Sequence, residues 1–279
     1  MRENLESYIS KWRLSDPQPL AQTATSNLYR VLTSNGLAVL KIFSKIGAED
    51  EKGAVDAIRW YDGEGAIRLL NHDEGAMLLE YADGEDLITL VKSDQDDRAT
   101  QIIIDVLKKL LRENQDNAPT RLTSLNRRFH SLFEKAEEDR WMGTASLFFR
   151  GAVVARNLLA DQGPPYILHG DIHHENIRWH SRRGWLAIDP KGLIGDRVYD
   201  AANALCNPNS LPNVVQSRER LLRHAAAMAA GLNISKARLL SYVFAHACLS
   251  ACWSLEDGLS PSFGIAMAEI AESCAREPT

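Results

Sequence analysis

The hydrophobic pattern of this chain changes character once, at Ala82-Asp83-Gly84, and this change limits the folds that the chain can adopt. Before that point, apolar residues form short β-prone runs bounded by turn residues. After it, they recur at the i, i+3, i+4 and i+7 spacing of helices that bury one face. We therefore expect an α+β fold in which residues 1–82 form a small lobe around an antiparallel sheet and residues 83–279 form a larger, mainly helical lobe.

The small lobe is expected to contain a β-hairpin and one inserted helix. Asn35-Gly36 lies between two β-prone runs, and an Asn-Gly pair in that position is the strongest short-range hairpin signal. Glu49–Tyr61 has helical spacing and separates the third run from the fourth. The expected strands, in chain order, are Leu20–Ala24, Leu28–Thr33, Leu37–Phe43, Ala66–Leu70 and Met77–Tyr81.

The large lobe is expected to be a set of helices interrupted by two short apolar runs, Tyr166–His169 and Trp185–Asp189. These two runs flank a polar segment rich in turn residues. The expected helices are Arg98–Asn114, one that is marked by Leu125 to Ala136, one that is marked by Leu147 to Leu158, Ser217–Gly231, Ser235–Leu255 and Ser262–Ala275.

Composition narrows the class of protein. Hydrophobic residues make up 45% of the chain and charged residues 25%, which are the averages of soluble globular proteins. Lys+Arg 32 against Asp+Glu 37 gives a net charge of −5, which argues against binding along nucleic-acid phosphates. No run of 18 apolar residues exists, and residues 1–12 lack the apolar core of a secretory signal, so we expect neither a membrane span nor export.

The four cysteines lie in the last third of the chain and form no C-x-x-C pair. They are typical of small buried hydrophobes in a reducing compartment: Cys206, Cys248, Cys252 and Cys274. We therefore expect a cytoplasmic protein, a monomer or weak homodimer, whose partners are small molecules rather than nucleic acid or membranes.

One segment carries most of the chemistry, and it reads ILHGDIHHENIRWHSRRGWLAID from Ile167 to Asp189. Its pattern H-x-D-x-x-x-x-N, followed by an apolar run and a further Asp, is that of a kinase catalytic loop. Phosphoryl transfer needs a carboxylate that orients the acceptor hydroxyl and hard oxygen ligands that hold magnesium. We therefore predict that Asp171 and His169 serve catalysis and that Asn176 and Asp189 bind magnesium beside ATP.

The small lobe supplies the residues that such a site needs for the nucleotide. Lys41 lies on the third expected strand, where a lysine can reach phosphates, and Glu51 lies near the start of the inserted helix, where it can pair with Lys41. The main chain from Glu80 to Ala82 ends the last strand and can hydrogen-bond an adenine. Ser26, between the first two strands, can cap phosphates in place of a glycine-rich loop.

The chain resembles the aminoglycoside phosphotransferase-like kinases, and within them the branch of streptomycin 6-phosphotransferases and hydroxyurea kinases. The resemblance extends over nearly the whole chain. The residues that carry it are HGDIHHEN (169–176), IDPKGLIGD (188–196), the lysine of VLK, GAIRLL (65–70), LLEYADG (78–84) and LSACW (249–253).

The resemblance implies a protein-kinase-like bilobal fold that uses ATP and magnesium to phosphorylate a hydroxyl of a small molecule. It assigns Asp171 to the acceptor hydroxyl, Asn176 and Asp189 to magnesium, and Lys41 with Glu51 to the phosphates. The implied acceptor is an aminoglycoside such as streptomycin, at its 6-hydroxyl, or hydroxyurea, which would give antibiotic resistance. Similar kinases act on choline, homoserine or sugars, so a kinase of a housekeeping metabolite is the alternative.

The segment after Asp189 departs from the Phe-Gly that follows the metal-binding Asp of protein kinases. Pro190-Lys191-Gly192 stands there instead, as is usual across the resembling family. A lysine two residues beyond a magnesium ligand brings a positive charge to the neighbourhood of the site.

The acceptor site is the least determined part of the sequence. A guanidinium-bearing acceptor favours carboxylates that accept paired hydrogen bonds. Asp196 and Asp200 are expected to cap and anchor the helix that follows them. The candidate acceptor contacts are Glu175, Asp196, Trp253, Glu256 and Asp257.

Two other interpretations remain at this point. His169, Asp171, His173 and His174 form a cluster that could hold zinc, as in a metallohydrolase. Such a site needs ligands from distant loops and leaves Asn176 unexplained, so we treat it as remote. A non-catalytic nucleotide-binding module would leave the complete set of catalytic residue types without a role.

Overall fold

The Asn35-Gly36 turn joins two strands whose pairing runs unbroken from Thr33 opposite Gly36 to Ser26 opposite Phe43. Gly36 has a φ of +120°, a conformation that residues with a side chain rarely adopt. The predicted hairpin is therefore confirmed. The structure is a computed structural model that describes residues 5–44, 47–112, 119, 121–143 and 146–275.

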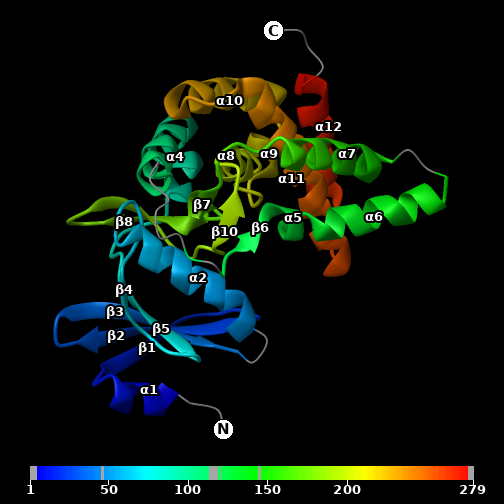
Figure 1. Ribbon diagram of the computed structural model, residues 1–279. Helices are drawn as coiled ribbons and strands as arrows, with labels where there is room; N and C mark the ends of the chain where they lie inside the picture. Colours follow the sequence, from blue (N-terminus) through cyan, green and yellow to red (C-terminus); the bar gives the residue numbers. More distant parts are fainter. Residues whose placement is uncertain (1–4, 45–46, 113–118, 120, 144–145, 276–279) are drawn as a thin grey trace.

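This hairpin is the centre of a five-stranded antiparallel sheet with the strand order β1-β2-β3-β5-β4. One helix lies on each face of the sheet (Figure 1). The elements of this small lobe are α1 (Leu5–Lys11), β1 (Ser15–Gln22), β2 (Ser26–Thr33), β3 (Gly36–Phe43), α2 (Gly47–Tyr61), β4 (Leu69–His72) and β5 (Ala76–Glu80).

The alternation of side chains along β3 decides which face of the sheet becomes functional. Ala38 and Leu40 point to the face that α1 covers, where they are buried together with Tyr8. Val39 points to the opposite face, which packs against α2. Lys41 follows the same alternation, so its side chain lies between the sheet and α2 rather than in solvent.

Two expected strands differ in position from the observed ones. β1 spans Ser15–Gln22 instead of Leu20–Ala24, and all of its residues are exposed, so this edge strand has no hydrophobic alternation to reveal it. β4 begins at Leu69, whereas Ala66 makes an isolated bridge to Ala187 of the other lobe.

That bridge is one of the joints between the two lobes. The N–H of Ile67 donates to the carbonyl of Ala187 at 3.0 Å, and the N–H of Ala187 donates to the carbonyl of Gly65 at 2.8 Å. Because the same residue both donates and accepts, the segment before β4 is attached to the large lobe by the main chain itself.

The large lobe is mostly helical and holds two small sheets near the junction (Figure 1). No helix in the described part of the chain is long and apolar enough to cross a membrane. The elements are α3 (Ile88–Lys92), α4 (Asp96–Leu110), β6 (Thr123–Ser124), α5 (Leu125–Arg128), α6 (His130–Trp141), α7 (Leu147–Ala160), β7 (Tyr166–Leu168), β8 (Ile177–His180), β9 (Gly184–Ala187), β10 (Leu193–Gly195), α8 (Val198–Leu205), α9 (Pro212–Val215), α10 (Arg218–Leu232), α11 (Lys236–Glu256) and α12 (Ser262–Ala275).

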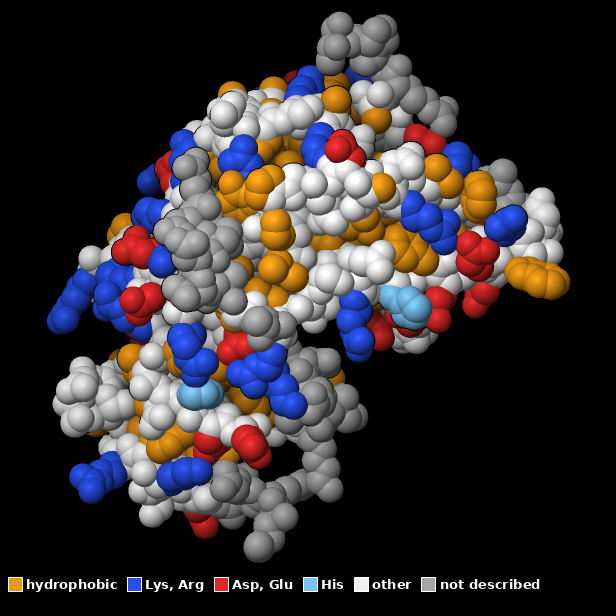
Figure 2. Space-filling model, in the orientation of Figure 1, with side chains coloured by type: hydrophobic (Ala, Val, Ile, Leu, Met, Phe, Trp, Pro, Cys, Tyr) orange, Lys and Arg blue, Asp and Glu red, His pale blue; other side chains and the backbone are white. Residues whose placement is uncertain are grey.

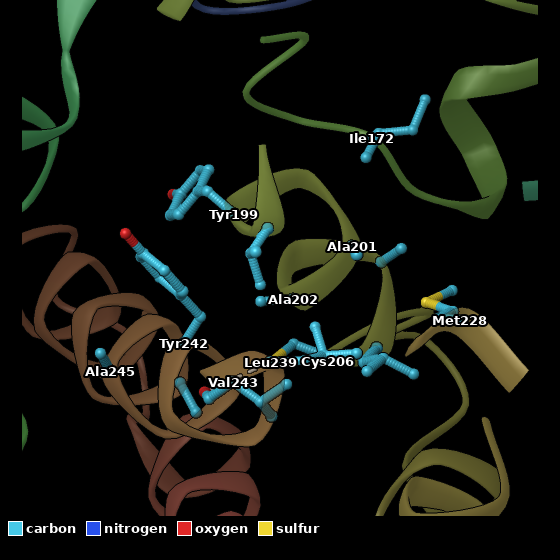
Figure 3. Close-up of a cluster of buried hydrophobic side chains, with 14 of the residues drawn as sticks. Ile172, Tyr199, Ala201, Ala202, Cys206, Met228, Leu239, Tyr242, Val243 and Ala245 are labelled. Atoms are coloured by element: carbon cyan, nitrogen blue, oxygen red, sulfur yellow. Dashed lines mark hydrogen bonds between the residues drawn. The ribbon is translucent and has the colours of Figure 1, made fainter. Parts of the chain in front are cut away.

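The core of the large lobe surrounds the short helix α8, all of whose residues are buried. Figure 3 shows Tyr199 of α8 beside Tyr242 of α11, with ring centroids 6.3 Å apart. Ile172, from the loop after β7, belongs to the same apolar cluster. The loop with the chemical motif is therefore packed directly on the core.

Most of the expected helices are confirmed, with small shifts of their ends. The helix predicted from Leu125 to Ala136 is divided into α5 and α6 at Phe129. The helix predicted over Arg98–Asn114 ends at Leu110, and Asn114 lies outside the described residues. Helix α8 is the helix that was expected to follow Asp196, and the expectation gave it no bounds.

Helix α2 approaches the segment after Asp189 so closely that only glycine fits at the contact. A Cβ on Gly53 would lie 2.8 Å from the carbonyl oxygen of Lys191 and 3.0 Å from that of Gly192. Gly192 has a φ of +67° and faces Gly53 in turn. This backbone contact fixes α2, which carries Glu51, against the large lobe.

We predict that Gly53→Ala destabilises the protein, because the new methyl group would overlap backbone that cannot move independently. Overpacking of this kind reduces the free energy of unfolding by about 1–3 kcal/mol. The matched control is Gly163→Ala, since a Cβ there meets nothing within 4 Å. Urea unfolding of both variants measures the effect, and equal stabilities would show that α2 can shift without loss.

Candidate active site

A carboxylate buried beneath the motif loop, residues 169–176, determines the loop's position. Asp200 of α8 is fully buried, and its two oxygens accept the N–H groups of His169 and Gly170, each at 2.8 Å. Burial raises the pKa of Asp200 to about 6, against the opposing effect of these two hydrogen bonds. At neutral pH the ionised carboxylate therefore holds the start of the loop.

His169 is fully buried, and both of its ring nitrogens are occupied by backbone groups. Nε2 lies 2.9 Å from the carbonyl of Ile188 and so donates to it, while Nδ1 accepts the N–H of Asp171 at 3.3 Å. Burial lowers the pKa of His169 to about 4, which keeps the ring neutral. The ring of His169 therefore faces the interior, where it can serve catalysis by positioning the loop.

Asp171 and Asn176 face each other at the two ends of the loop. The side-chain N–H₂ of Asn176 donates to the carbonyl oxygen of Asp171 at 2.9 Å, which leaves the amide oxygen of Asn176 for another partner. The N–H of Ile188 donates to the carbonyl of Asn176 at 2.9 Å, so Asn176 lies across from the residue that precedes Asp189. The Asp171 carboxylate keeps 29% of its surface exposed.

Lys41 is the centre of a buried ion cluster that joins the lobes. Its Nζ lies 2.6 Å from Glu51 Oε1 and 2.6 Å from Asp189 Oδ1, and its side chain is only 4% exposed. Burial raises the pKa of Glu51 more than Lys41 lowers it. Burial also opposes the ionisation of Asp189, but Lys41 and Lys191 outweigh it and lower the pKa of that carboxyl to about 2. The predicted pairing of Lys41 with Glu51 is confirmed.

Lys191 points into the site. Its ammonium lies 3.4 Å from Asp189 Oδ2 and 3.8 Å from Asp171 Oδ2. Burial lowers the pKa of this lysine less than the carboxylates of Asp189 and Asp171 raise it, so the net shift is upward. The sequence predicts a positive charge near the site, and that charge is the Lys191 ammonium, which lies between the carboxylates of Asp189 and Asp171.

An apolar slot of about 250 Å³ lies between the lobes, and Lys41 and Asp189 form its polar end. Among the residues that the structure describes, none accepts the backbone N–H of Ala82 at the slot's edge. An apolar slot with one unpaired donor and an ionic end matches a planar base attached to phosphates. The apolar lining comprises Leu20, Ala21, Leu28, Val39, Ile67, Leu79, Ala82 and Ile188.

Two residues predicted to bind the nucleotide have their side chains engaged elsewhere. The carboxylate of Glu80 pairs with Arg183 and accepts the N–H of Arg68 at 3.0 Å, and the N–H of Glu80 donates to the carbonyl of Arg68 at 2.9 Å, so only the carbonyl of Glu80 remains for a ligand. Ser26 is 1% exposed and its hydroxyl lies 3.1 Å from that of Thr23. The turn between β1 and β2 therefore offers its backbone rather than the Ser26 hydroxyl.

Trp253 is connected to the loop through an arginine that the sequence did not single out. The Arg128 guanidinium lies 4.2 Å from the centre of the Trp253 ring, and its Nη2 donates to the carbonyl of Gly170 at 3.3 Å. Arg128 Nε also lies 3.4 Å from the Tyr199 hydroxyl. Arg128 holds the carbonyl of the residue before Asp171. It thereby places the C-terminal end of α11 beside Asp171.

The other acceptor candidates are divided between buried and exposed positions. Asp196 is 6% exposed and accepts from Arg238 Nε at 2.7 Å and from the N–H of Val198 at 3.0 Å, so it caps α8 as expected and we do not retain it as an acceptor contact. Glu256 and Asp257 are exposed at the end of α11. Asp200 does not cap a helix, which corrects that expectation.

Glu175 is half-buried and tied to its neighbours. Its Oε2 lies 2.9 Å from Nδ1 of His173, and its Oε1 accepts the Ser210 hydroxyl at 3.1 Å. Burial raises the pKa of Glu175, but the hydrogen bond and charge of His173 and the hydrogen bond from Ser210 together outweigh it, so the net shift is downward. Glu175 is therefore held on the loop and can meet an acceptor only where it remains exposed.

Three contributors to the site were missed, or left without an orientation, by sequence reasoning. Asp200 had a signal, because it stands in the otherwise apolar stretch VYDAANAL. Arg128 had none, since nothing in Arg127-Arg128 distinguishes the second arginine from the first. The direction of Lys191 depends on the contact between Gly53 and Gly192, which is visible only in the fold.

The donor set fits magnesium better than zinc. Asp189 and Asn176 offer a carboxylate and an amide oxygen, the hard ligands that magnesium accepts alongside water and phosphates. Zinc needs a denser set of side chains, and the described residues contain no group of three or more His, Cys, Asp and Glu placed to hold a metal. His174 is 1% exposed and neither of its ring nitrogens has a partner among the described residues.

Residues 11–258 match the sequence pattern of a family described as aminoglycoside/hydroxyurea antibiotic resistance kinase. The chain is 36% identical over 254 residues to the streptomycin 3''-kinase of Klebsiella pneumoniae, covering 90% of this chain and 92% of that protein. It is 28% identical over 275 residues to the streptomycin 6-kinase of Streptomyces griseus, covering 94% and 85%.

Among solved structures, the chain is similar to aminoglycoside phosphotransferase APH(4)-Ia in ternary complex with ADP and hygromycin B. The TM-score is 0.61 at 15% identity, over 98% of this chain and 99% of that one. At this identity the likeness establishes the fold, and the expected protein-kinase-like arrangement of an antiparallel sheet followed by a helical lobe is confirmed.

The raised pKa of Asp200 predicts a pH-dependent stability. Folded Asp200 keeps its proton up to about pH 6, whereas an unfolded aspartate loses it near 3.8. Folding therefore takes up a proton between these values, and this group lowers the free energy of unfolding as pH rises through that window, with no further slope above it. Asp200→Asn cannot ionise, so it should lack this decrease.

Urea unfolding at intervals between pH 4.5 and 7.5 measures both slopes, with the exposed Asp94→Asn as matched control. Identical slopes for wild type and Asp200→Asn would show that Asp200 ionises at its ordinary value in the folded protein.

Proposed function

This chain belongs to the aminoglycoside/hydroxyurea antibiotic resistance kinase family, and we propose that it transfers the γ-phosphoryl group of ATP to a hydroxyl of streptomycin. The observation that carries the proposal is the contact of Lys41 with Asp189 in the lining of the apolar slot, with Lys191 connecting Asp189 to Asp171 outside it. A slot for a base, a cation for phosphates and a carboxylate for a hydroxyl lie there in the order in which the reaction needs them.

The nucleotide lies between the lobes in this proposal. Its adenine fills the apolar slot and accepts the free N–H of Ala82, while Lys41 binds the phosphates that connect to the base. Glu51 keeps the Lys41 ammonium in place at 2.6 Å. Backbone N–H groups of the turn between β1 and β2 cover the phosphates, as oriented backbone amides do in other phosphate sites.

Asp189 and the free amide oxygen of Asn176 hold magnesium, which when bound neutralises charge on the phosphates and aligns them. The low pKa of Asp189, about 2, keeps its carboxylate ionised and ready to bind a cation throughout the neutral range. Lys41 holds the other side of that carboxylate, so Asp189 does not need to reorient when its ligand arrives.

Asp171 orients the acceptor hydroxyl and accepts its proton. The carboxylate is partly exposed near the start of the loop, which is held by hydrogen bonds to Asp200 and His169. Since the transition state of phosphoryl transfer is loose, most of the rate enhancement comes from holding the hydroxyl in line with the γ-phosphorus. Asp171 is therefore positioned by hydrogen bonds to the backbone of the loop.

The acceptor approaches from the end of α11. Trp253 and its stacked Arg128 form one wall beside Gly170, and Glu256 and Asp257 continue from that wall into solvent. Streptomycin carries guanidinium groups, which bind carboxylates through paired hydrogen bonds. Basic and acidic side chains both gather where the two lobes meet, as Figure 2 shows on one face of the molecule.

The similarities to a 3''-kinase and to a 6-kinase leave the choice of hydroxyl to experiment. Acceptor-dependent ADP formation, measured with streptomycin, hydroxyurea and other aminoglycosides, tests the proposal directly. Phosphorus–proton correlation in the NMR spectrum of the product then identifies the modified oxygen. Nucleotide binding without turnover on any of these acceptors would redirect the search to a metabolite with a free hydroxyl.

We predict that Asp171→Asn reduces kcat by about 10²–10⁴-fold, because an amide cannot take up the hydroxyl proton. Nucleotide affinity should change by less than about threefold, since Asp171 lies outside the slot. Asp94→Asn on the surface is the matched control for the change in charge. Equal losses of turnover and nucleotide binding in Asp171→Asn would place this carboxylate at the nucleotide instead.

We predict that the double variant Glu256→Gln, Asp257→Asn raises the KM for streptomycin about twofold to thirtyfold, with kcat and the KM for ATP unchanged. Exposed ion pairs contribute about 0.2–1 kcal/mol each, which gives this range for two contacts. Glu269→Gln, exposed on α12, is the control. An unchanged KM in the double variant would exclude these carboxylates from the acceptor site.

A further inference from the structure

Lys191 occupies the gap between the two carboxylates of the site. Its ammonium lies 3.4 Å from Asp189 Oδ2 and 3.8 Å from Asp171 Oδ2. The other oxygen of Asp189 is bound by Lys41 at 2.6 Å. Asp189 is thus flanked by two lysines. Lys191 is the one on the side of Asp171, the carboxylate that orients the acceptor hydroxyl.

The main chain holds Lys191 in this gap. Its N–H donates to the carbonyl of His169 at 2.7 Å, and the next residue, Gly192, lies against Gly53 of α2. The side chain is nevertheless 42% exposed, so its charged end is free to contact a ligand. The main chain of Lys191 is therefore fixed, and its ammonium is available to a ligand.

Lys191 does not line the slot that we assign to the base, whereas Lys41 and Asp189 do. The two lysines consequently serve different parts of the nucleotide. Lys41 reaches phosphates from the base side. Lys191 reaches the place that a phosphoryl group must cross between Asp189, which holds the metal, and Asp171, which holds the hydroxyl.

We propose that Lys191 is a catalytic residue whose ammonium binds an oxygen of the γ-phosphoryl group and remains bound to it during transfer. This inference rests on the proposed function. In the step, the bond between the γ-phosphorus and the bridging oxygen of ADP breaks and the bond to the acceptor oxygen forms. The acceptor proton passes to Asp171, and Lys191 keeps its own protons throughout.

The physical reason is the distribution of charge in the transition state. Negative charge spreads over the three outer oxygens of the transferring group, and a preorganised cation beside them lowers the barrier. A cation on the acceptor side also screens that group from the Asp171 carboxylate. Without Lys191, two negative groups would have to approach each other to form the new bond.

A purely structural role for Lys191 makes different predictions. If the ammonium only reduces repulsion between Asp171 and Asp189, its removal should strengthen magnesium binding and affect ADP and a triphosphate analogue equally. If it binds the γ-phosphoryl group, its removal should weaken only ligands that carry that group. Comparing two nucleotides in one variant therefore separates the two roles.

The test uses the full-length chain and four forms: wild type, Lys191→Met, Lys191→Arg and the control Lys108→Met, which removes an exposed lysine of α4. Calorimetry in the presence of magnesium measures the affinities for ADP and for AMP-PNP. We expect Lys191→Met to weaken AMP-PNP about tenfold and ADP less than twofold, and to lower kcat about 10²-fold. Lys191→Arg should retain the preference for AMP-PNP, because a guanidinium also binds phosphate oxygens.

The outcomes distinguish this inference from the function on which it rests. Equal effects on ADP and AMP-PNP, or tighter magnesium binding with an unchanged preference, would overturn the role of Lys191 and leave the kinase assignment standing. Binding of both nucleotides without turnover on aminoglycosides would still test Lys191 through the ADP to AMP-PNP ratio. Failure of the wild type to bind either nucleotide would overturn the proposed function and this inference with it.

Discussion

The structure depends on a lysine ammonium that is held between two carboxylates from distant parts of the chain. Lys41 comes from the central hairpin of the sheet, Glu51 from α2 and Asp189 from the large lobe. A charge that is 4% exposed is strongly unfavourable unless it is paired, so the three elements must be arranged together. The requirement extends outward, because α2 can bring Glu51 to Lys41 only where Gly53 lets it touch the segment after Asp189.

A second buried charge performs the corresponding task for the motif loop. Among the residues that the structure describes, Asp200 has no ion-pair partner, and its carboxylate instead accepts two backbone N–H groups at the start of the loop. It lies on a helix enclosed by the core, so the packing of α8 is transmitted to the loop (Figure 3). The partly exposed carboxylate of Asp171 is therefore supported by the buried carboxylate of Asp200. Between them, the neutral ring of His169 accepts the N–H of Asp171.

The sequence predicted what local chemistry determines and missed what packing determines. The Asn35-Gly36 hairpin, the helix with Glu51 and the order of His169, Asp171, Asn176 and Asp189 follow from turn geometry, periodicity and motif spacing, and the structure contains them. The edge strand β1 is exposed along its whole length and lacks the one-sided hydrophobic pattern on which such predictions depend. All the acceptor candidates except Trp253 rest on their charge, which does not show that Arg238 occupies Asp196 or that Arg128 stacks on Trp253.

The main-chain joint at Ala187 has a consequence for how ligands enter and leave. Gly65 and Ile67 are tied to Ala187 by backbone hydrogen bonds, and Gly53 is in contact with Gly192, so the small lobe is attached to the large lobe through the main chain at two places. These attachments restrict how far the lobes can separate, and with them how far Lys41 can move from Asp189 when the slot exchanges its ligand.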